Sequence, residues 1–325
     1  MTTSATVTPL GRLIRHQKDY WTLDKVLRNL GLPVLGIALF LLIWQAASQS
    51  IETSLGQFPG PAEVTEQAGN LWSEHQAEQE RAEKFIAMQE ARNERILEKN
   101  PDAEVRIRPY TGYPTFIDQI GTSLVTVMCG FLLASLIAIP LGIVTGMSPA
   151  VQAALNPLIQ LFKPVSPLAW LPLVTIVVSA VYVTDDPMFE KSFITSMITV
   201  TLCSLWPTLI NTTSGVASVS PDLQNVSRVL RLPPLTHVRK IVLPSAIPQM
   251  FTGLRVSLGI AWMVLIAAEM LAQNPGLGKF VWDEFQNGSS DSLARIMVAV
   301  ITIGFIGLLL DRVMVLLERK VAWDQ

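Results

Sequence analysis

Cysteine, histidine and charged residues are scarce in this sequence of 325 residues. It has two cysteines and three histidines, and Asp, Glu, Lys and Arg together make up only 15% of it. Cys129 and Cys203 stand in separate apolar runs, each without a nearby second cysteine, which argues against a disulfide framework or a CxxC metal motif. The histidines lie in three unconnected polar segments, so a histidine-based metal site is not expected.

A cleavable signal peptide and a strong net charge are also missing. The first thirty residues are polar and basic, and no small-residue cleavage site leads from the first apolar run into a soluble body. The formal net charge of −2 argues against a general affinity for nucleic acid. The apolar runs contain no HExxH motif and no paired catalytic carboxylates, so we do not expect the chain to be an enzyme by itself.

The sequence is rich in long apolar runs instead. Half of its residues are hydrophobic, and the mean hydropathy is +0.41, which is typical of an all-α protein with several membrane spans. About 20 helical residues cross a bilayer. By that criterion the predicted spans are 31–50, 122–147, 168–183, 193–216, 247–272 and 293–317. Prolines precede the third span and also lie within its first turns, and Pro207 is expected to break the fourth span. Gly142 and Gly146 in the second span permit close helix packing.

Basic flanks set the predicted orientation of these spans. Residues 1–30, the loop 217–244 and the tail 321–325 are expected on the cytoplasmic side, where Lys and Arg accumulate. Residues 51–118 form a charged insert on the opposite, periplasmic side, and 119–320 form the membrane core. In the insert, 71–100 lacks Gly and Pro, which predicts a helix. This helix is either a solvated excursion or a docking surface for an extracytoplasmic partner.

One polar, basic stretch interrupts the apolar second half. Residues 220–248 read SPDLQNVSRVLRLPPLTHVRKIVLPSAIP. Ser220 is a good helix cap, Pro221 suits the first helical position, and Asp222 complements the helix dipole. An apolar face follows at helical spacing, and the helix must end before the paired prolines 233 and 234. Two short elements are therefore expected to form an elbow between spans.

The end of this elbow resembles the cytoplasmic EAA loop of permease subunits in bacterial ABC importers. Ile241, Leu243 and Pro244 match the Ile-x-Leu-Pro end of that loop. The same alignment puts 225–227 (Asn-Val-Ser) at the Glu-Ala-Ala positions and Arg231 at the glycine position, so the first half departs from the pattern. The family glycine permits a positive φ without steric cost. Because Arg231 stands in its place, the sequence does not decide whether the same turn forms here.

The resemblance extends over roughly residues 110–320. The segments KPVSPLAWLPL, GLRVSLGIAWMVLIAAEML, VWDEFQNG and IGLLLDR look like the nitrate, sulfonate and taurine group of ABC importer permeases, and most like its nitrate-type members. This implies the type I (MetI-like) fold, with about six transmembrane helices plus a coupling helix, in the bacterial inner membrane. It further implies a homodimer, two cytoplasmic ATPase subunits that hold ATP and Mg, and an extracytoplasmic substrate-binding protein, with no cofactor on this chain.

The implied substrate is a small oxyanion, with nitrate or nitrite first. Bicarbonate, cyanate or a sulfonate such as taurine are the alternatives within the family. A stand-alone channel or secondary transporter is the alternative from a different class. The basic elbow has no evident purpose without an ATPase partner, and the two halves of the sequence show no clear inverted repeat. The ABC importer is therefore the preferred hypothesis.

The resemblance assigns the elbow to coupling with the ATPase. Its apolar face would dock in a groove of the ATPase subunit, and its arginines would supply charge pairs at the rim. The predicted coupling residues are Leu223, Asn225, Val226, Ser227, Arg228, Leu230, Arg231, Ile241, Leu243 and Pro244.

Candidate residues of the translocation path lie in the fourth and fifth spans. Ser204, Thr208, Asn211 and Thr212 offer uncharged hydrogen bonds, or else bond back to the preceding helical turn. Arg255 and Glu269 are ionisable groups in an apolar span, about 21 Å apart along a helix. Arg255 either holds an anion transiently or pairs with a group on a neighbouring helix. For Glu269 a structural or gating role is expected, because it would repel an anion.

Overall fold

The computed structural model describes residues 28, 31–53, 56–100, 104–183, 189–289 and 291–323. The predicted cytoplasmic segment 1–30, the residues 184–188 that follow the third predicted span, and the last two residues of the tail lie almost entirely outside these ranges. The chain divides into two units, one ending at Glu66 and one beginning at Gln67. Its helical composition, with five or six candidate membrane spans, confirms the predicted all-α membrane fold.

The first unit contains helix α3, Leu32–Ser50, and a short hairpin. Strands β1, Glu52–Thr53, and β2, Gly56–Gln57, pair antiparallel, and the chain then enters helix α4. The indole Nε1 of Trp44 donates to the carbonyl of Pro59 at 3.0 Å, which ties the end of α3 to the segment after the hairpin. The apolar side chains of α3 are mostly exposed, as expected of a span that faces lipid.

Helix α4, Pro61–Lys99, is ten residues longer at its start than the predicted helix 71–100. The Glu80–Lys84 pair on its surface is formed at 3.3 Å, as the i,i+4 spacing allows. After α4 the chain returns along the helix in extended form. The side-chain amide of Gln89 bonds both the N–H and the C=O of Arg108, at 2.8 and 2.9 Å. The hydroxyl of Tyr110 donates to Glu78 at 2.7 Å, which lowers the pKa of that carboxyl and raises the pKa of the tyrosine.

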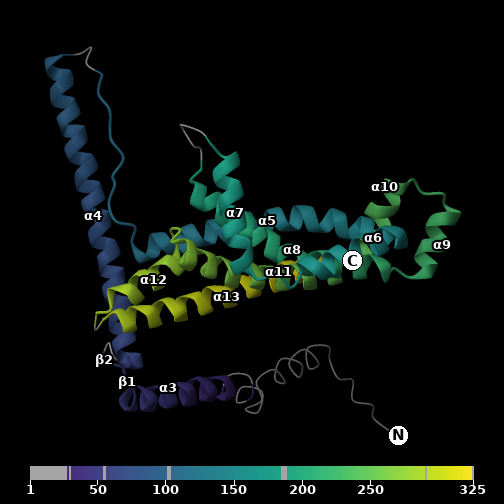
Figure 1. The fold of residues 1–325 in the computed structure, drawn as a ribbon, viewed down its shortest axis with the longest axis horizontal. Helices are drawn as coiled ribbons and strands as arrows, with labels where there is room; N and C mark the ends of the chain where they lie inside the picture. Colours follow the sequence, from purple (N-terminus) through teal and green to yellow (C-terminus); the bar gives the residue numbers. More distant parts are fainter. Residues whose placement is uncertain are drawn as a thin grey trace, which may run out of the picture. The chain divides into compact units, whose positions relative to one another are not determined.

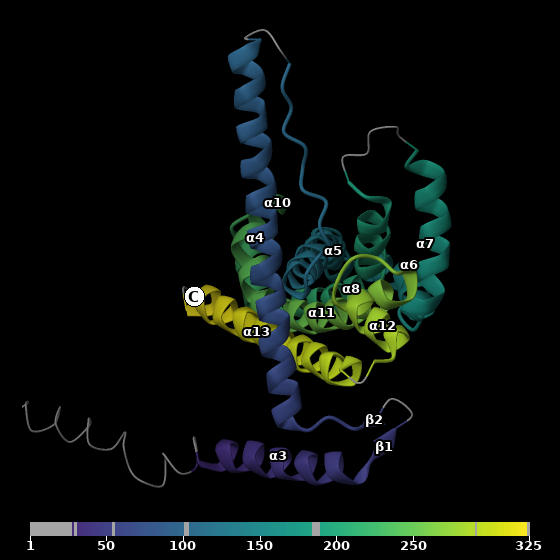
Figure 2. The same ribbon diagram turned by 90° about the vertical axis from the view of Figure 1, so that its left-hand side faces the viewer.

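Three long helices form the centre of the second unit. They are α5, Phe116–Met147, α8, Lys191–Ala217, and α11, Leu243–Ala272, and α8 packs against both of the others (Figures 1 and 2). Small residues set the α5–α8 distance, because a Cβ added at Gly142 would lie 2.7 Å from the Cβ of Thr212. The glycine pair of the second span therefore serves close packing, as its spacing predicts.

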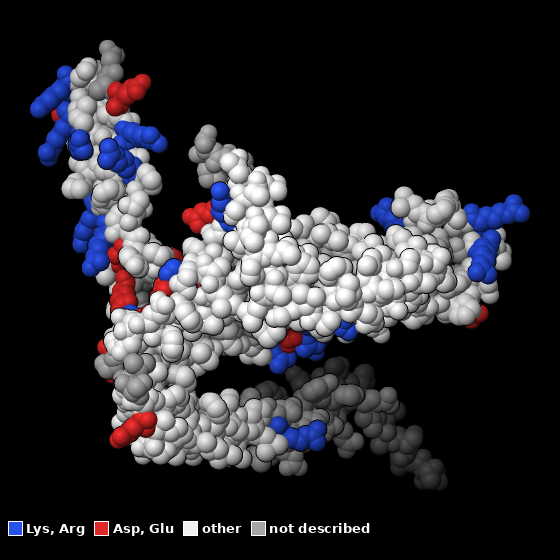
Figure 3. All heavy atoms as spheres, viewed as in Figure 1, with Lys and Arg blue, Asp and Glu red and all other residues white. Residues whose placement is uncertain are grey.

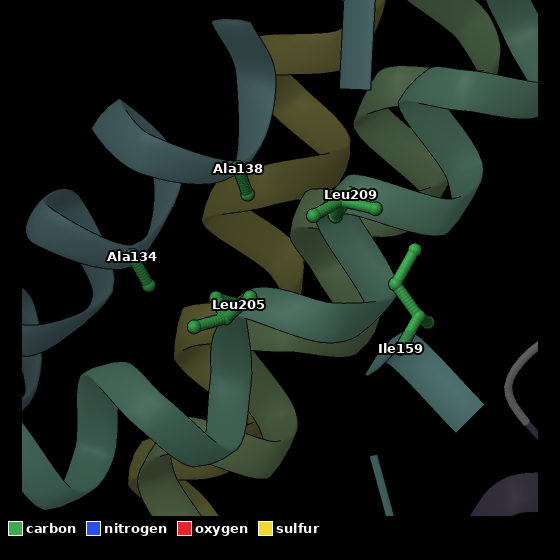
Figure 4. Packing of buried hydrophobic residues seen from close by; sticks show 5 residues of the cluster. All are labelled: Ala134, Ala138, Ile159, Leu205 and Leu209. Atoms are coloured by element: carbon green, nitrogen blue, oxygen red, sulfur yellow. The ribbon is translucent and has the colours of Figure 1, made fainter. Parts of the chain in front are cut away.

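A compact apolar cluster holds α5, α8 and a shorter helix together. Ala134 and Ala138 of α5 face Leu205 and Leu209 of α8, and Ile159 completes the cluster from helix α6, Pro149–Phe162 (Figure 4). The small alanines of α5 leave room for the leucines of α8, so the two helices pack closely.

The prolines at the entry of the third span interrupt the helix there, whereas Pro207 does not break the fourth span. Helices α6, Pro149–Phe162, and α7, Pro167–Val181, bend by 99° at the intervening Pro164 segment, so the third span is a 15-residue helix that counts as a span only together with α6. By contrast, α8 continues through Pro207, where a break was predicted. Packing on both sides of α8 stabilises the helix there despite the lost N–H, and such prolines are tolerated in buried spans.

The segment between the fifth and sixth predicted spans is largely helical. Gln273 and Gly276 have positive φ values of 55° and 148°, and they turn the chain into helix α12, Leu277–Asn287. Helix α13, Ser292–Trp323, then extends six residues beyond the predicted end of the sixth span. Both α12 and α13 pack on α11. Because α11 also contacts the segment 238–242 that precedes it, α11 connects the elbow region with the end of the bundle where α12 lies.

Candidate coupling elbow and translocation residues

The elbow consists of two arms joined by a proline turn. The first arm is helix α9, Pro221–Val229. The second is the short helix α10, Pro234–His237, followed by a π-helical segment, Val238–Val242, that runs directly into α11 (Figure 1). The hydroxyl of Ser220 accepts from the N–H of Leu223 at 3.4 Å, so the predicted cap is present.

The turn after α9 retains a glycine-type conformation without glycine. Arg231 has φ +48°, in the left-handed region. The N–H of Leu232 bonds the carbonyl of Ser227, and the N–H of Arg231 bonds that of Arg228, both at 3.1 Å. These two bonds define a Schellman motif with Arg231 at the left-handed position. The question left open by the missing family glycine is thus answered: the turn forms, with the strain of a side chain at positive φ.

A hydrogen bond that the sequence analysis missed braces the two arms. The hydroxyl of Ser227, on α9, lies 2.8 Å from Nδ1 of His237, at the end of α10. Ser227 is buried, although its neighbours on α9 are exposed. The ten-residue separation of these two side chains across a proline turn gave no periodic signal by which sequence alone could pair them.

The predicted docking face of α9 is exposed to solvent. Val226 is 50% exposed, Val229 81% and Leu230 63%. Asn225, Arg228 and Arg231 are exposed around them, and Figure 3 shows Lys and Arg side chains over this end of the bundle, whereas the spans beside it are almost free of charge. An apolar face with a basic rim is available here for a partner.

The base of the elbow is part of the membrane core. Val242 is buried against Val216, Ala246 and Met250, and Leu243 packs on this cluster. The π-helical segment continues into α11 without a loop. Ile241, Leu243 and Pro244 therefore lie at the junction of the elbow with α11, while the residues of α9 lie on the exposed arm.

The small polar residues of the fourth span lie between helices. The hydroxyl of Ser204 donates to the carbonyl of Val200 at 2.7 Å, and Asn211 donates to that of Pro207 at 2.9 Å. Thr208 donates across to Ser257 of α11 at 2.7 Å. The hydroxyl of Thr212 is fully buried and has no hydrogen-bond partner among the residues that the structure describes. Their place on the path stays a prediction, and their burial favours helix packing.

Arg255 forms a bidentate ion pair with Asp311. The Nε of Arg255, on α11, donates to Oδ1 of Asp311, on α13, and Nη2 donates to Oδ2 at 2.9 Å. The partner on a neighbouring helix, one of the two alternatives for Arg255, is therefore present. Asp311 was missed as a candidate, although an acidic residue inside the sixth apolar run is a visible signal.

Glu269 has a different environment at the other end of α11. Its carboxylate accepts from the hydroxyl of Ser123 at 2.8 and 2.9 Å and from the N–H of Gly278 at 2.9 Å, and the side chain is 1% exposed. Ser123 in turn accepts from the N–H of Leu277 at 2.9 Å. This cluster ties α5 and the start of α12 to α11. The structure does not bring Glu269 and Arg255 together.

A cavity lies between the insert and the end of the helix bundle that carries Glu269. It has a volume of about 390 Å³ and lies between α4, α12 and α13. Arg295 of α13 donates to Glu284 of α12 at 3.3 Å and also pairs with Glu74 of α4. The pair with Glu74 fastens α4 to the membrane core at that point, and the pair with Glu284 joins α12 to α13.

Comparisons with known proteins agree with this architecture. Residues 138–323 match the family described as "Binding-protein-dependent transport system inner membrane component". A chain of the methionine ABC transporter MetNI, in an inward-facing structure, aligns with a TM-score of 0.55 over 63% of this chain and 95% of that chain, at 13% identity. This likeness concerns the fold and is consistent with the predicted MetI-like arrangement.

Two kinds of transport protein are similar in sequence. The chain is 33% identical over 299 residues to the bicarbonate transport system permease protein CmpB of Synechococcus elongatus, which covers 89% of this chain and 88% of that protein. It is 39% identical over 203 residues to the nitrate import permease protein NrtB of Synechocystis sp., which covers 62% of this chain and 69% of that protein. With its elbow, its α-helical core and the family match over more than half of its length, the chain belongs to the inner membrane components of binding-protein-dependent transport systems, the permeases of ABC importers.

Proposed function

We propose that this chain forms the membrane path of an ATP-driven importer for a small oxyanion, with nitrate (or nitrite) as the first candidate. Two copies would form the path in a bacterial inner membrane, with both chain ends cytoplasmic. Two ATPase subunits, which bind ATP and Mg, would drive it, and an extracytoplasmic protein would deliver the anion. Support for the substrate comes from the similarity to a nitrate import permease and to a bicarbonate transport permease.

The exposed elbow is the observation that carries the coupling role. Its apolar face is presented on an arm that is braced by Ser227 and His237 and continuous with α11. Burial of this face in an ATPase groove is favourable at about 25 cal/mol per Å². Closure of the two ATPases would then displace both elbows and tilt α11 in each copy.

Reconstitution of the complete importer in liposomes tests the proposal. We expect nitrate to stimulate ATP hydrolysis when its binding protein is present, and uptake to stop when the ATPase is inactivated. Uptake that persists without ATP would contradict the ABC assignment and favour a channel.

Bicarbonate is the second candidate, because the similarity to the bicarbonate permease extends over a larger part of this chain. Stimulation of ATP hydrolysis by bicarbonate and not by nitrate would decide for it.

A further inference from the structure

The Arg255–Asp311 pair occupies an unusual position for a structural ion pair. Both residues lie in helices with the length and hydropathy of membrane spans. Yet the two side chains are 45% and 36% exposed, so α11 and α13 do not enclose them. A charged pair that faced lipid would be costly, and such groups normally face a water-filled path or another protein chain.

The geometry of the pair leaves part of the guanidinium available. Asp311 occupies the edge formed by Nε and Nη2. Nη1 has no hydrogen-bond partner in the part of the chain that the structure describes, and it carries two N–H groups. A planar guanidinium recognises a carboxylate or another oxyanion through two parallel hydrogen bonds, so the Nη1 side remains suited to one further anion.

A small depression adjoins the pair. It has a volume of about 50 Å³ and is lined by Trp262 and by Gly259 and Gly307, beside Arg255 and Asp311. About 10–15 Å³ measured in this way is enough for one water molecule, so an ion of a few heavy atoms has room. The indole of Trp262 is held by a hydrogen bond to the carbonyl of Ile303 at 3.0 Å, and nothing lies within 4 Å of a Cβ placed at Gly259.

From these observations we propose that Arg255 binds the passing oxyanion in this depression, and that Asp311 is the counter-charge that makes the binding transient. The proposal rests on the oxyanion importer proposed above. Before the anion binds, Asp311 neutralises Arg255 and positions its guanidinium. An incoming monovalent oxyanion binds at Nη1 and competes with Asp311 for the positive charge. After the anion leaves, the pair re-forms, so Asp311 lowers affinity and favours release.

The alternative is that the pair only holds α11 to α13 or to a second copy. The two hypotheses differ for a variant that lacks both charges. Removing one partner of an ion pair leaves an uncompensated charge and is destabilising, whereas replacing both by neutral groups is often tolerated. A purely structural pair would thus regain function in the double variant Arg255→Gln/Asp311→Asn.

Uptake of labelled nitrate and bicarbonate by the reconstituted importer, normalised to assembled complex, provides the test. We expect the double variant, which leaves no unpaired charge, to assemble and to lose at least tenfold in uptake, and we expect Arg255→Gln to lose at least as much. Asp311→Asn should lower KM and kcat together, because the anion is bound more tightly and released more slowly. The control is Arg319→Gln, which removes an exposed positive charge further along α13 and should leave uptake unchanged.

The possible outcomes distinguish a failure of this inference from a failure of the proposed function. Wild-type uptake of neither anion would overturn the proposed function and the inference with it. Normal wild-type uptake that the double variant retains would overturn the inference alone and establish a structural pair. Asp311→Asn with unchanged KM and kcat would also contradict the role given to Asp311.

Discussion

At the scale of single residues, the contacts of one buried carboxylate hold the C-terminal end of α11. Glu269 is the acceptor for Ser123 and for the N–H of Gly278, and all three groups are buried. Glu269→Ala leaves these donors unpaired, which we expect to destabilise the protein by about 1–3 kcal/mol for each donor. Thermal unfolding of the purified permease in detergent measures the effect.

Glu94→Ala, at an exposed position of α4, is the matched control for that substitution and should leave the unfolding temperature unchanged. Glu269→Gln retains one acceptor oxygen and should fall between the two. Equal stability of Glu269→Ala and the wild type would show that this hydrogen-bond cluster contributes nothing to the fold.

Arg231 is the other residue whose conformation sets local structure. A side chain at φ +48° costs about 1–2 kcal/mol relative to the right-handed region, and glycine does not incur this cost. We expect Arg231→Gly to unfold at or slightly above the wild-type temperature, and Arg231→Val, which is β-branched, to unfold below it. A higher stability of the valine variant would contradict the left-handed turn.

At the scale of elements, the exposed face of α9 is expected to couple the permease to its motor. Val226→Asp and Leu230→Glu place charge on this face, where docking would have to desolvate it. Because both side chains are exposed in the free chain, the fold should be unaffected, while ATP-dependent uptake falls at least tenfold. Uptake and ATP hydrolysis measured on the same proteoliposomes reveal the uncoupling.

The control for α9 is Leu235→Asp, since Leu235 is also apolar and 80% exposed but lies on α10. It should retain most of the uptake. Loss of uptake in this variant and normal uptake in both α9 variants would place the coupling contact on the other arm.

A second prediction at the scale of elements concerns the close packing of α5 on α8. A Cβ at Gly146 would lie 2.6 Å from the carbonyl oxygen of Thr213, whereas one at Gly121, on the same helix, meets nothing within 4 Å. Gly146→Ala should therefore destabilise by about 1–3 kcal/mol through overpacking. Gly121→Ala should be neutral or stabilising by up to about 1 kcal/mol through helix propensity. Paired unfolding measurements compare the two, and equal effects would contradict the packing of α5 against α8.

At the scale of the whole molecule, the part of the insert from residue 67 onward belongs to the second unit and projects from it. Its outer part is held by contacts between α4 and its own return segment, while Glu74 and Arg295 fasten its base to the core. Replacing 83–107 by a linker of about six residues, which reaches roughly 20 Å, preserves this base. We expect the unfolding temperature and basal ATP hydrolysis of this variant to stay at wild-type values.

The same deletion decides between the two hypotheses for the insert. Arg92, Arg95 and Lys99 form an exposed basic stripe with Met88 and Ile96. If the insert docks the extracytoplasmic protein, the deletion should reduce uptake stimulated by that protein, and the wild-type association should weaken with salt. Unchanged stimulation would identify the insert as a solvated excursion.

The sequence by itself determined the fold class, most span positions and the elbow. Long apolar runs have few alternatives to membrane helices, because every backbone polar group must be paired within lipid. Capping and proline signals are local, so Ser220 and the paired prolines bounded α9 correctly. The Ile-x-Leu-Pro end likewise indicated the permease family, which the family match confirmed.

Only the tertiary structure decided which polar groups meet and how the prolines act. Pro207 remains inside α8 because the neighbouring helices hold that segment, whereas the prolines after α6 coincide with a sharp bend. Asp311 opposite Arg255, Ser123 opposite Glu269 and His237 opposite Ser227 are pairs across elements. The period of a helix predicts which residues share a face, but the rotation and register of neighbouring helices, which decide these pairs, depend on the packing of the whole core.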